Sequence, residues 1–348
     1  MAYTTINKPS DYFNTVLYTG NESTNAITGV GFQPDFCWIK NRDCSLDGTD
    51  DHKLWDSVRG ATNALISNST AAEFTQSGLD SFDSDGFTLG SHVGINRSGD
   101  ACVAWNWLAG GTASSNTDGS TTSSVSVNTT AGFSIVSYAG NDTADSTIGH
   151  GLGVKPDFII FKDRTATGRW HTYHSVLGAT GHMRLDSTSA FNTATSFMND
   201  TEPTSSVINL GTSAHVNGVS QDHIAYCFAE KKGFSKFGTY TGNGSADGPM
   251  VYTGFKPAFV IVKDYSQLSG WEMADNKRTS SGGNVIDKEL RPNDNIAETT
   301  NNYIDFLSNG FKIRNNFGNW NGSGATYIYM AFAEHPFVSS TGTPLTAR

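Results

Sequence analysis

The sequence predicts an all-β protein with three tandem β-sandwich or jelly-roll-like modules that are related by an internal repeat. Three observations predict this fold class. The 348 residues include 37 glycines, and only 16% of the residues are charged, whereas long surface helices are usually dense in Glu, Lys and Arg. Short apolar runs bounded by turn residues occur throughout the chain, as expected for many short strands. One of these runs occurs three times in closely similar form.

The repeated run begins with proline and ends with lysine followed by Asn or Asp. It reads PDFCWIKN at 34–41, PDFIIFKD at 156–163 and PAFVIVKD at 257–264. Proline is tolerated at the first residue of a strand, and consecutive apolar residues are typical of a strand that is covered on both faces. We therefore expect the same buried strand in each of the three copies.

Other landmarks keep the same order in each copy. A tyrosine followed by X-Gly-Asn precedes the run, and an aromatic strand closes each copy, at 103–107, 224–230 and 328–334. A tryptophan follows the run at Trp55, Trp170 and Trp271, with the longest spacing in the first copy. We interpret these tryptophans as one shared position, with an insertion near Cys44. Recurrence at one position favours a structural role over a sugar-stacking role.

The repeat divides the chain into modules at 1–111, 125–234 and 235–337. Residues 112–124 are rich in Gly, Ser and Thr, which predicts a flexible linker. Residues 338–348 are interpreted as a C-terminal tail. Asp85-Gly86 and Asn309-Gly310 favour hairpin turns, because type I′ turns need positive φ at both central residues. Residues 63–76 are the strongest helix candidate.

Charge and hydropathy exclude several partner classes. The net charge is −10, from 23 basic and 33 acidic residues, which argues against nucleic-acid binding because phosphate affinity needs concentrated Lys and Arg. No apolar run reaches the roughly 18 residues of a membrane-spanning helix, so no membrane insertion is expected. The first residues lack the basic and apolar regions of a secretory signal peptide.

Motifs for catalysis or metal binding are missing from the sequence. The cysteines have no zinc-type spacing, and no phosphate-binding glycine loop or serine elbow occurs. His171 and His174 stand three residues apart, so in a strand they point to opposite faces. The sequence predicts no enzyme, no cofactor, no metal site and four free thiols, at Cys37, Cys44, Cys102 and Cys227.

One loop combines amides with aromatic rings. Amides both donate and accept hydrogen bonds, and loops carry binding residues more often than strands do. This mixture suits a hydroxyl-rich ligand. The alternative is a polar hairpin tip whose ring packs back onto its own module. The predicted ligand-binding residues are Asn315, Asn316, Phe317, Asn319 and Trp320.

Several strings together resemble a repeated module of uncharacterised bacteriophage proteins, found largely in tailed phages of marine bacteria. The resemblance covers nearly the whole chain. That module is a domain of unknown function, often encoded among virion or tail-fibre genes and sometimes likened to concanavalin-A-like lectins. It brings no defined site residues with it. The strings stand at 147–153, 225–230, 240–249, 254–257 and 306–311.

The resemblance implies a virion structural protein, part of a tail fibre or adhesin that binds a host-surface glycan or protein. The alternative is a capsid decoration, head-fibre, tail-tube or nozzle protein without receptor binding. A depolymerising enzyme is a weaker third possibility, because no converging carboxylates are evident. The expected partners are other virion subunits and the host surface, and a homo-oligomer is expected. The expected location is the virion, assembled in the host bacterial cytoplasm, which agrees with free cysteines.

Overall fold

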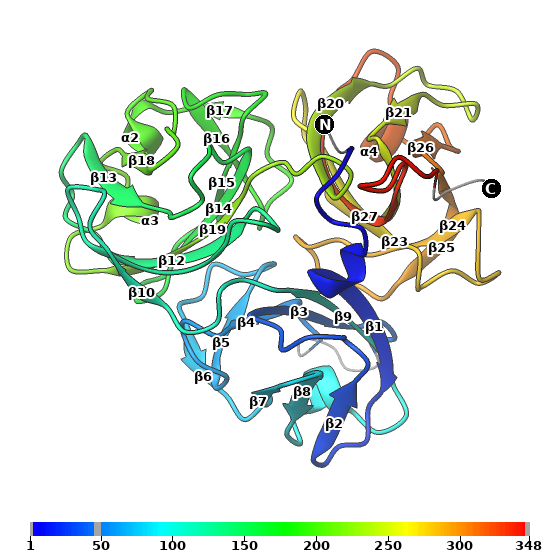
Figure 1. Ribbon diagram of the computed structural model, residues 1–348, viewed down its shortest axis with the longest axis horizontal. Coiled ribbons are helices and arrows are strands. Elements are labelled where there is room, and N and C mark those ends of the chain that lie inside the picture. Colours follow the sequence, from blue (N-terminus) through cyan, green and yellow to red (C-terminus); the bar gives the residue numbers. More distant parts are fainter. Residues whose placement is uncertain (1–2, 45–49, 345–348) are drawn as a thin grey trace.

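The computed structural model describes residues 3–44 and 50–344, and in this part of the chain the fold is all-β (Figure 1). All paired strands are antiparallel, and the described helices are only three or four residues long. This confirms that the chain is all-β, as predicted. Figure 1 shows three groups of sheets arranged around a common centre, and we refer to them as the first, second and third sheet groups.

The first sheet group lies within residues 9–107. Its main sheet has the strand order β1-β9-β3-β4-β5-β6, and a second sheet has the order β2-β8-β7. The elements are η1 (Pro9–Asp11), β1 (Phe13–Thr19), β2 (Asn25–Thr28), β3 (Phe36–Asn41), β4 (Lys53–Asp56), β5 (Asn63–Ile66), β6 (Phe74–Thr75), β7 (Leu79–Asp83), β8 (Gly86–Leu89), α1 (Val93–Asn96) and β9 (Ala101–Trp107).

The second sheet group lies within residues 114–228. Its main sheet has the order β10-β11-β12-β19-β14-β15-β16-β17, and β13 pairs with β18 in a second sheet. The elements are β10 (Ser114–Asn116), β11 (Ser123–Asn128), β12 (Phe133–Ala139), β13 (Ser146–Gly149), β14 (Phe158–Asp163), β15 (His171–His174), β16 (Gly181–Arg184), β17 (Asn192–Thr193), α2 (Thr195–Met198), β18 (Val207–Leu210), α3 (Ala214–Asn217) and β19 (Asp222–Phe228).

The third sheet group lies within residues 235–336. Its main sheet has the order β20-β27-β22-β23, and the second sheet has the order β21-β26-β25-β24. The elements are β20 (Ser235–Thr241), β21 (Met250–Tyr252), β22 (Phe255–Asp264), β23 (Trp271–Asp275), β24 (Ile286–Glu289), β25 (Thr299–Leu307), β26 (Gly310–Ile313), α4 (Gly318–Asn321) and β27 (Thr326–Pro336).

The three main sheets share one strand order over their central strands, β1-β9-β3-β4, β12-β19-β14-β15 and β20-β27-β22-β23. They also share one register. The phenylalanine at the third position of the repeated run faces the last residue of the next strand in the pairs Phe36–Asp56, Phe158–His174 and Phe259–Asp275. These agreements support the repeat, although the division into three separate domains stays a prediction.

The register changes the assignment of the shared tryptophan. Trp170 and Trp271 stand four residues before His174 and Asp275, and the residue four before Asp56 is His52 rather than Trp55. The interpretation of Trp55 as the same position was therefore wrong, because the insertion before His52 is shorter than the tryptophan spacing suggests. Part of that insertion, residues 45–49, lies outside the described residues.

One hydrophobic cluster contains buried residues from all three sheet groups. Phe36 of the first group stacks on Tyr226 of the second with ring centroids 4.4 Å apart, and Trp107 lies 5.7 Å from Phe332 of the third. Phe228 lies 6.0 Å from Phe332. Burying apolar surface contributes about 25 cal/mol per Å². The sheet groups are thus fused around a common core, a point that the sequence left open.

The two ends of the described chain meet on this body. The Asn7 Nδ2 atom donates to Ser340 Oγ at 2.8 Å, and the Ser340 backbone N–H donates to Asn7 Oδ1 at 2.8 Å. The Tyr3 hydroxyl donates to the Gly254 carbonyl at 2.6 Å. The first residues are therefore attached to the third sheet group before the chain enters the first group.

Two segments differ from their predicted conformations. Residues 112–124, predicted as a flexible linker, include β10, which pairs with β11, and the Thr121 N–H donates to the Thr147 carbonyl at 2.9 Å. Residues 63–76, the helix candidate, form β5 and β6 instead. In both segments sheet pairing overrides the local composition, because propensity is only a weak prior beside tertiary contacts.

Candidate functional site

The seam between the first and second sheet groups contains a chain of buried charges. Asp56 accepts from the Arg59 Nε atom at 2.5 Å and from the Tyr226 hydroxyl at 2.7 Å. Arg59 also pairs with Glu73 at 3.0 Å, and Glu73 pairs with Arg164 of the second group at 2.9 Å. Arg59 and Asp56 have fully buried side chains, so each charge depends on the other for compensation.

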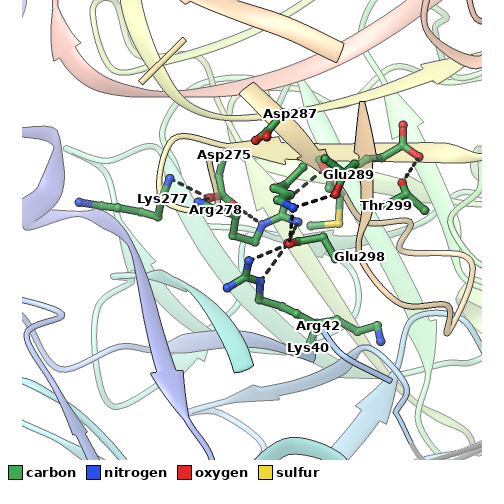
Figure 2. Close-up of polar contacts among 12 residues, drawn as sticks. Lys40, Arg42, Asp275, Lys277, Arg278, Asp287, Glu289, Glu298 and Thr299 are labelled. Carbon is green, nitrogen blue, oxygen red and sulfur yellow. Dashed lines mark hydrogen bonds and ion pairs between the residues drawn. The ribbon is translucent and has the colours of Figure 1, made fainter. Parts of the chain in front are cut away.

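The seam between the third and first sheet groups repeats this arrangement. Asp275 accepts from Arg278 at 2.6 Å and from the Trp105 indole at 3.0 Å. Glu298 accepts from Arg278 at 3.0 Å and from Arg42 at 2.7 Å, and Figure 2 shows it lying between the two guanidinium groups. Two seams are therefore held by ordered ion pairs that fix the sheet groups relative to one another.

The seam between the second and third sheet groups is mainly apolar. Leu177, Phe191 and Tyr265 pack against the central cluster. Its polar contacts include the Phe191 N–H, which donates to the Tyr265 carbonyl at 2.9 Å, and the Trp271 indole, which donates to the Arg184 carbonyl at 2.9 Å. His174 Nε2 lies 3.3 Å from the Tyr329 carbonyl. A pocket of the described residues opens beside this seam.

This pocket, which we call the seam pocket, has a volume of about 390 Å³. One lining residue, Thr188, comes from the second sheet group, and the Ser269 N–H donates to its carbonyl at 2.9 Å. The other lining residues belong to the third group and are mostly polar: Gln267, Leu268, Ser269, Gly270, Glu272, Arg291, Asn293, Asp294, Gly318 and Asn319.

Two buried carboxylates lie at the inner side of the seam pocket, Glu272 in its lining and Glu289 behind Glu272. Glu272 is 0% exposed and Glu289, behind it, is 1% exposed. Arg291 donates to both, at 3.0 Å to Glu272 Oε2 and 3.0 Å to Glu289 Oε1. The Asn319 amide donates to Glu272 Oε1, and the Trp320 indole donates to Glu289 Oε2. Burial, followed by the neighbouring Glu289 charge, raises the pKa of Glu272 well above its usual value.

The predicted ligand-binding loop supplies one lining side chain to the seam pocket. Asn319 lines it, Phe317 is 38% exposed, and Asn316 is exposed outside the lining. Trp320 is 0% exposed and packs on Tyr303, so its ring presents no face to a ligand. Asn315 is buried too, and its amide donates to the Tyr303 carbonyl at 2.9 Å.

Trp320 and Asn315 therefore support the loop from within. This is the alternative stated above, in which the ring of the loop packs back onto its own module. The sequence reasoning missed Glu272, Arg291 and Asn293 entirely. A usable signal was present, since Glu272 directly follows a tryptophan that recurs at Trp170, where the next residue is His171. A position that changes its chemistry between copies is a candidate for specialisation.

The second sheet group has histidines at the positions that correspond to this wall. The correspondence follows from the paired strands, because Thr172 faces Met183 as Met273 faces Leu290, and from the short helices α3 and α4, whose last residues, Asn217 and Asn321, both accept a backbone N–H from a Gly-Asn turn. The corresponding pairs are Glu272–His171, Glu289–His182, Arg291–Arg184 and Asn319–His215.

These three histidines form a cluster of rings, in which His171 and His182 are buried and His215 is half-buried. The ring centroids of His171 and His182 are 3.9 Å apart, and those of His171 and His215 are 4.8 Å apart. The ring nitrogens of His171 and His182 have no hydrogen-bond partner. Burial lowers the pKa of His171 and lowers that of His182 to about 4, and the neighbouring Arg184 acts in the same direction. The rings are therefore neutral near pH 7.

The first sheet group has a third kind of residue at this position. Lys53 stands three residues before Asp56, as Glu272 stands before Asp275. It is buried, and burial lowers its pKa to about 8. Leu54 faces Leu65 as Met273 faces Leu290, so the residue that corresponds to Glu289 is Ala64, which is buried and apolar. One position in a shared framework thus carries a carboxylate, an imidazole or an ammonium group.

Within residues 3–44 and 50–344, no group of three or more His, Cys, Asp or Glu side chains has an arrangement that could hold a metal ion. Over the same residues, no helix has the length and apolar character needed to cross a membrane. The four cysteines are free thiols, as expected, and Cys37, Cys102 and Cys227 are buried.

The fold and the site define a class of protein: an all-β chain with sheet groups fused around one core and a polar pocket beside a seam. The chain belongs to the family described as a domain of unknown function, DUF7483, whose family model matches residues 8–336. No curated protein and no solved structure matches the chain.

Proposed function

We propose that this chain is a structural protein of a bacteriophage virion, of the tail-fibre or adhesin kind, that binds a glycan or protein on the host surface. The observation that carries the binding role is the seam pocket, whose polar side chains are held in place by buried partners. Glu272 fixes Asn319 and Arg291 at the pocket wall, so a ligand meets groups that are already ordered. Such preorganisation lowers the entropic cost of binding.

The rigid framework around the pocket supports this role. The Arg42–Glu298–Arg278 bridge and its counterpart around Arg59 connect the sheet groups, and the central cluster excludes water between them. A body of this kind transmits force without rearranging, as a fibre subunit must. Several copies on one particle would make weak single sites effective together, in line with the expected homo-oligomer.

Binding is favoured over hydrolysis by the position of the acids. Glycosidases place two carboxyl groups on either side of the scissile bond, roughly 5–9.5 Å apart. Here Glu272 and Glu289 stand on one wall and share Arg291, and Glu289 is not among the lining residues. Release of reducing ends from host polysaccharide by the purified chain would contradict the binding role.

The test is phage adsorption. We expect a phage with the double substitution Asn319→Ala and Asp294→Ala to attach to its host more slowly, because both pocket side chains are lost. The matched control is Asp142→Ala, an exposed aspartate of the second sheet group. Phage lacking the protein should attach least. Unchanged adsorption by assembled particles that lack the chain would reject the proposal.

The second candidate is a virion component without receptor binding, such as a capsid decoration or tail-tube protein. Exposed apolar side chains favour it, since Leu268, Val219 and Tyr252 are 78%, 64% and 57% exposed and such residues are common at contacts between subunits. An electron-microscopy map of the particle separates the two candidates. A position buried between subunits, with the seam pocket covered, would favour this second role.

A further inference from the structure

Carboxyl groups outnumber cationic groups in the lining of the seam pocket, with Glu272 and Asp294 against Arg291, and this restricts the ligands that the pocket can accept. Arg291 is the only cationic side chain among the lining residues, all of which the structure describes. It donates to Glu272 and to Glu289 behind it, so its charge is already compensated. Asp294 adds a further carboxylate to the lining. An anionic ligand would therefore meet repulsion without a free cation to offset it.

Recruiting Arg291 to an anion would leave the inner wall unstable. Glu272 and Glu289 are almost completely buried, and a buried carboxylate that loses its cation is strongly destabilised. The Arg291 side chain is about one-third exposed, so it can donate an additional hydrogen bond to a ligand while it keeps both carboxylates. This geometry suits a neutral acceptor such as a hydroxyl or an amide oxygen.

The remaining polar groups offer both donors and acceptors. The Ser269 hydroxyl is buried at the pocket and has no hydrogen-bond partner. The Asn293 Oδ1 atom accepts from the Trp271 N–H at 2.7 Å, which turns its NH₂ group to other partners, and the Gln267 amide NH₂ donates to Asp264, which leaves its carbonyl oxygen. Mixed donors and acceptors of this kind match ligands with several hydroxyl groups.

The volume of the seam pocket and one apolar side chain in its lining further define the ligand. The volume of about 390 Å³ is at the small end of the range of ligand pockets. Leu268 lines the pocket and is 78% exposed, so it offers an apolar contact to the C–H face of a ring. The ligand class is therefore small, rich in hydroxyls and without negative charge.

We propose that the seam pocket binds neutral or amine-bearing saccharide units and excludes acidic ones such as uronic acids. This inference deepens the proposed function and rests on it. The contacts that carry it are the Arg291 guanidinium shared by two buried carboxylates, the unpaired Ser269 hydroxyl and the Asp294 carboxylate at the lining.

The test uses the full chain and three monosaccharides that share the gluco configuration and differ in charge. N-acetylglucosamine, glucosamine and glucuronic acid are titrated separately, and binding is followed by ligand-observed NMR at pH 7 and low salt. We expect glucuronic acid to bind about tenfold more weakly than N-acetylglucosamine, a difference of about 1.4 kcal/mol. Glucosamine should bind at least as well as N-acetylglucosamine. Equal or tighter binding of glucuronic acid would overturn the proposal, and so would no binding of any of the three.

Two variants, Asp294→Asn and Asp142→Asn, test whether the preference among the three sugars arises in the seam pocket. Asp294→Asn should remove the preference for glucosamine and reduce the rejection of glucuronic acid by about threefold, because one carboxylate is lost. Asp142→Asn, an exposed aspartate outside the lining, should leave all three affinities unchanged. An unchanged preference in Asp294→Asn would place binding elsewhere and overturn the proposal. Thermal unfolding curves of the variants serve as folding controls.

The outcome is separable from that of the adsorption test. Loss of adsorption in the pocket variant without sugar binding would keep the receptor role and reject the saccharide class. Sugar binding with the expected charge preference, but with unchanged adsorption, would keep the pocket assignment and reject the receptor role.

Discussion

The carboxylate wall of the third sheet group and the histidine cluster of the second occupy corresponding positions in two sheets of the same order and register. In the third group, Glu272 and Glu289 are buried as charges because Arg291 pairs with both. In the second group, His171 and His182 are buried as neutral rings, and the corresponding Arg184 Nε atom has no partner. One framework thus accommodates either paired charges or uncharged imidazoles, and the paired charges lie beside the seam pocket.

The largest expected effect comes from the two corresponding arginines. Arg291→Met removes the cation shared by Glu272 and Glu289 and leaves two buried carboxylates, so we expect a loss of about 3 kcal/mol in the free energy of unfolding. Arg184→Met removes a cation that only repels protonated histidines and should change stability by less than about 1 kcal/mol. Denaturant unfolding of both variants at pH 7 measures the difference. Equal losses would show that the two positions do not differ in their pairing.

The second prediction concerns the loss of folding stability at low pH. The folded-state pKa of His182 is about 4, below the usual value of about 6.5, so the unfolded chain binds more protons in this range and stability falls as pH drops from about 6.5 toward 4. His171 and His215 shift in the same direction. The raised pKa of Glu272 has the opposite sign, because the folded state then binds the extra proton. The second group should therefore lose stability in acid before the third.

Hydrogen exchange at pH 7 and pH 4.5 checks this difference by region. We expect protection in β15 and β16 to decrease at pH 4.5 while β23 and β24 keep theirs. His182→Gln should reduce the acid-induced loss of stability by about 1–3 kcal/mol, since one pKa unit corresponds to about 1.4 kcal/mol. His335→Gln, at an exposed site, is the control. Equal loss of protection in both regions would contradict the assignment of acid sensitivity to the cluster.

The smallest effect is expected at Asn319 and its counterpart His215. Asn319→Ala removes a donor to Glu272, and hydrogen bonds to charged groups contribute about 1.5–3 kcal/mol, of which Arg291 retains part. We therefore expect a loss of about 1–2 kcal/mol at pH 7. His215→Ala should cost less stability at pH 5 than at pH 7, because burial lowers the pKa of His215 and this residue therefore disfavours the folded state in acid. Thermal unfolding of the two variants at pH 7 and pH 5 measures both losses of stability. A larger loss for His215→Ala than for Asn319→Ala at pH 5 would contradict the comparison.

The sequence predicted the fold class and the repeated strands because apolar runs and turn residues report local structure directly. It did not predict that the lysine ending each run is buried, with Nζ of Lys40 and Lys162 donating to the carbonyl of the next residue at 2.8 and 2.9 Å. It also missed the seam pocket. Glu272, Glu289 and Asn319 come from different elements, and only the tertiary fold brings them together.

The candidate loop illustrates the same limit on a smaller scale. The amide and aromatic pattern indicated 315–320, and Asn319 does line the pocket. Which members face outward depended on partners distant in sequence, since Trp320 is held by Glu289 and Asn315 by Tyr303. The composition of residues 112–124 likewise did not predict strand β10. This strand forms because it pairs with β11, and the composition of the segment alone does not show that pairing.

The contact between Asn7 and Ser340 has a mechanical consequence. Since Asn7 lies against Ser340 and Tyr3 is attached to Gly254, tension applied to both ends acts on these terminal contacts first and does not pull the sheets apart in series. A longer polypeptide that continued beyond these residues would carry the body as a side branch, free to turn outward from the axis of its attachment.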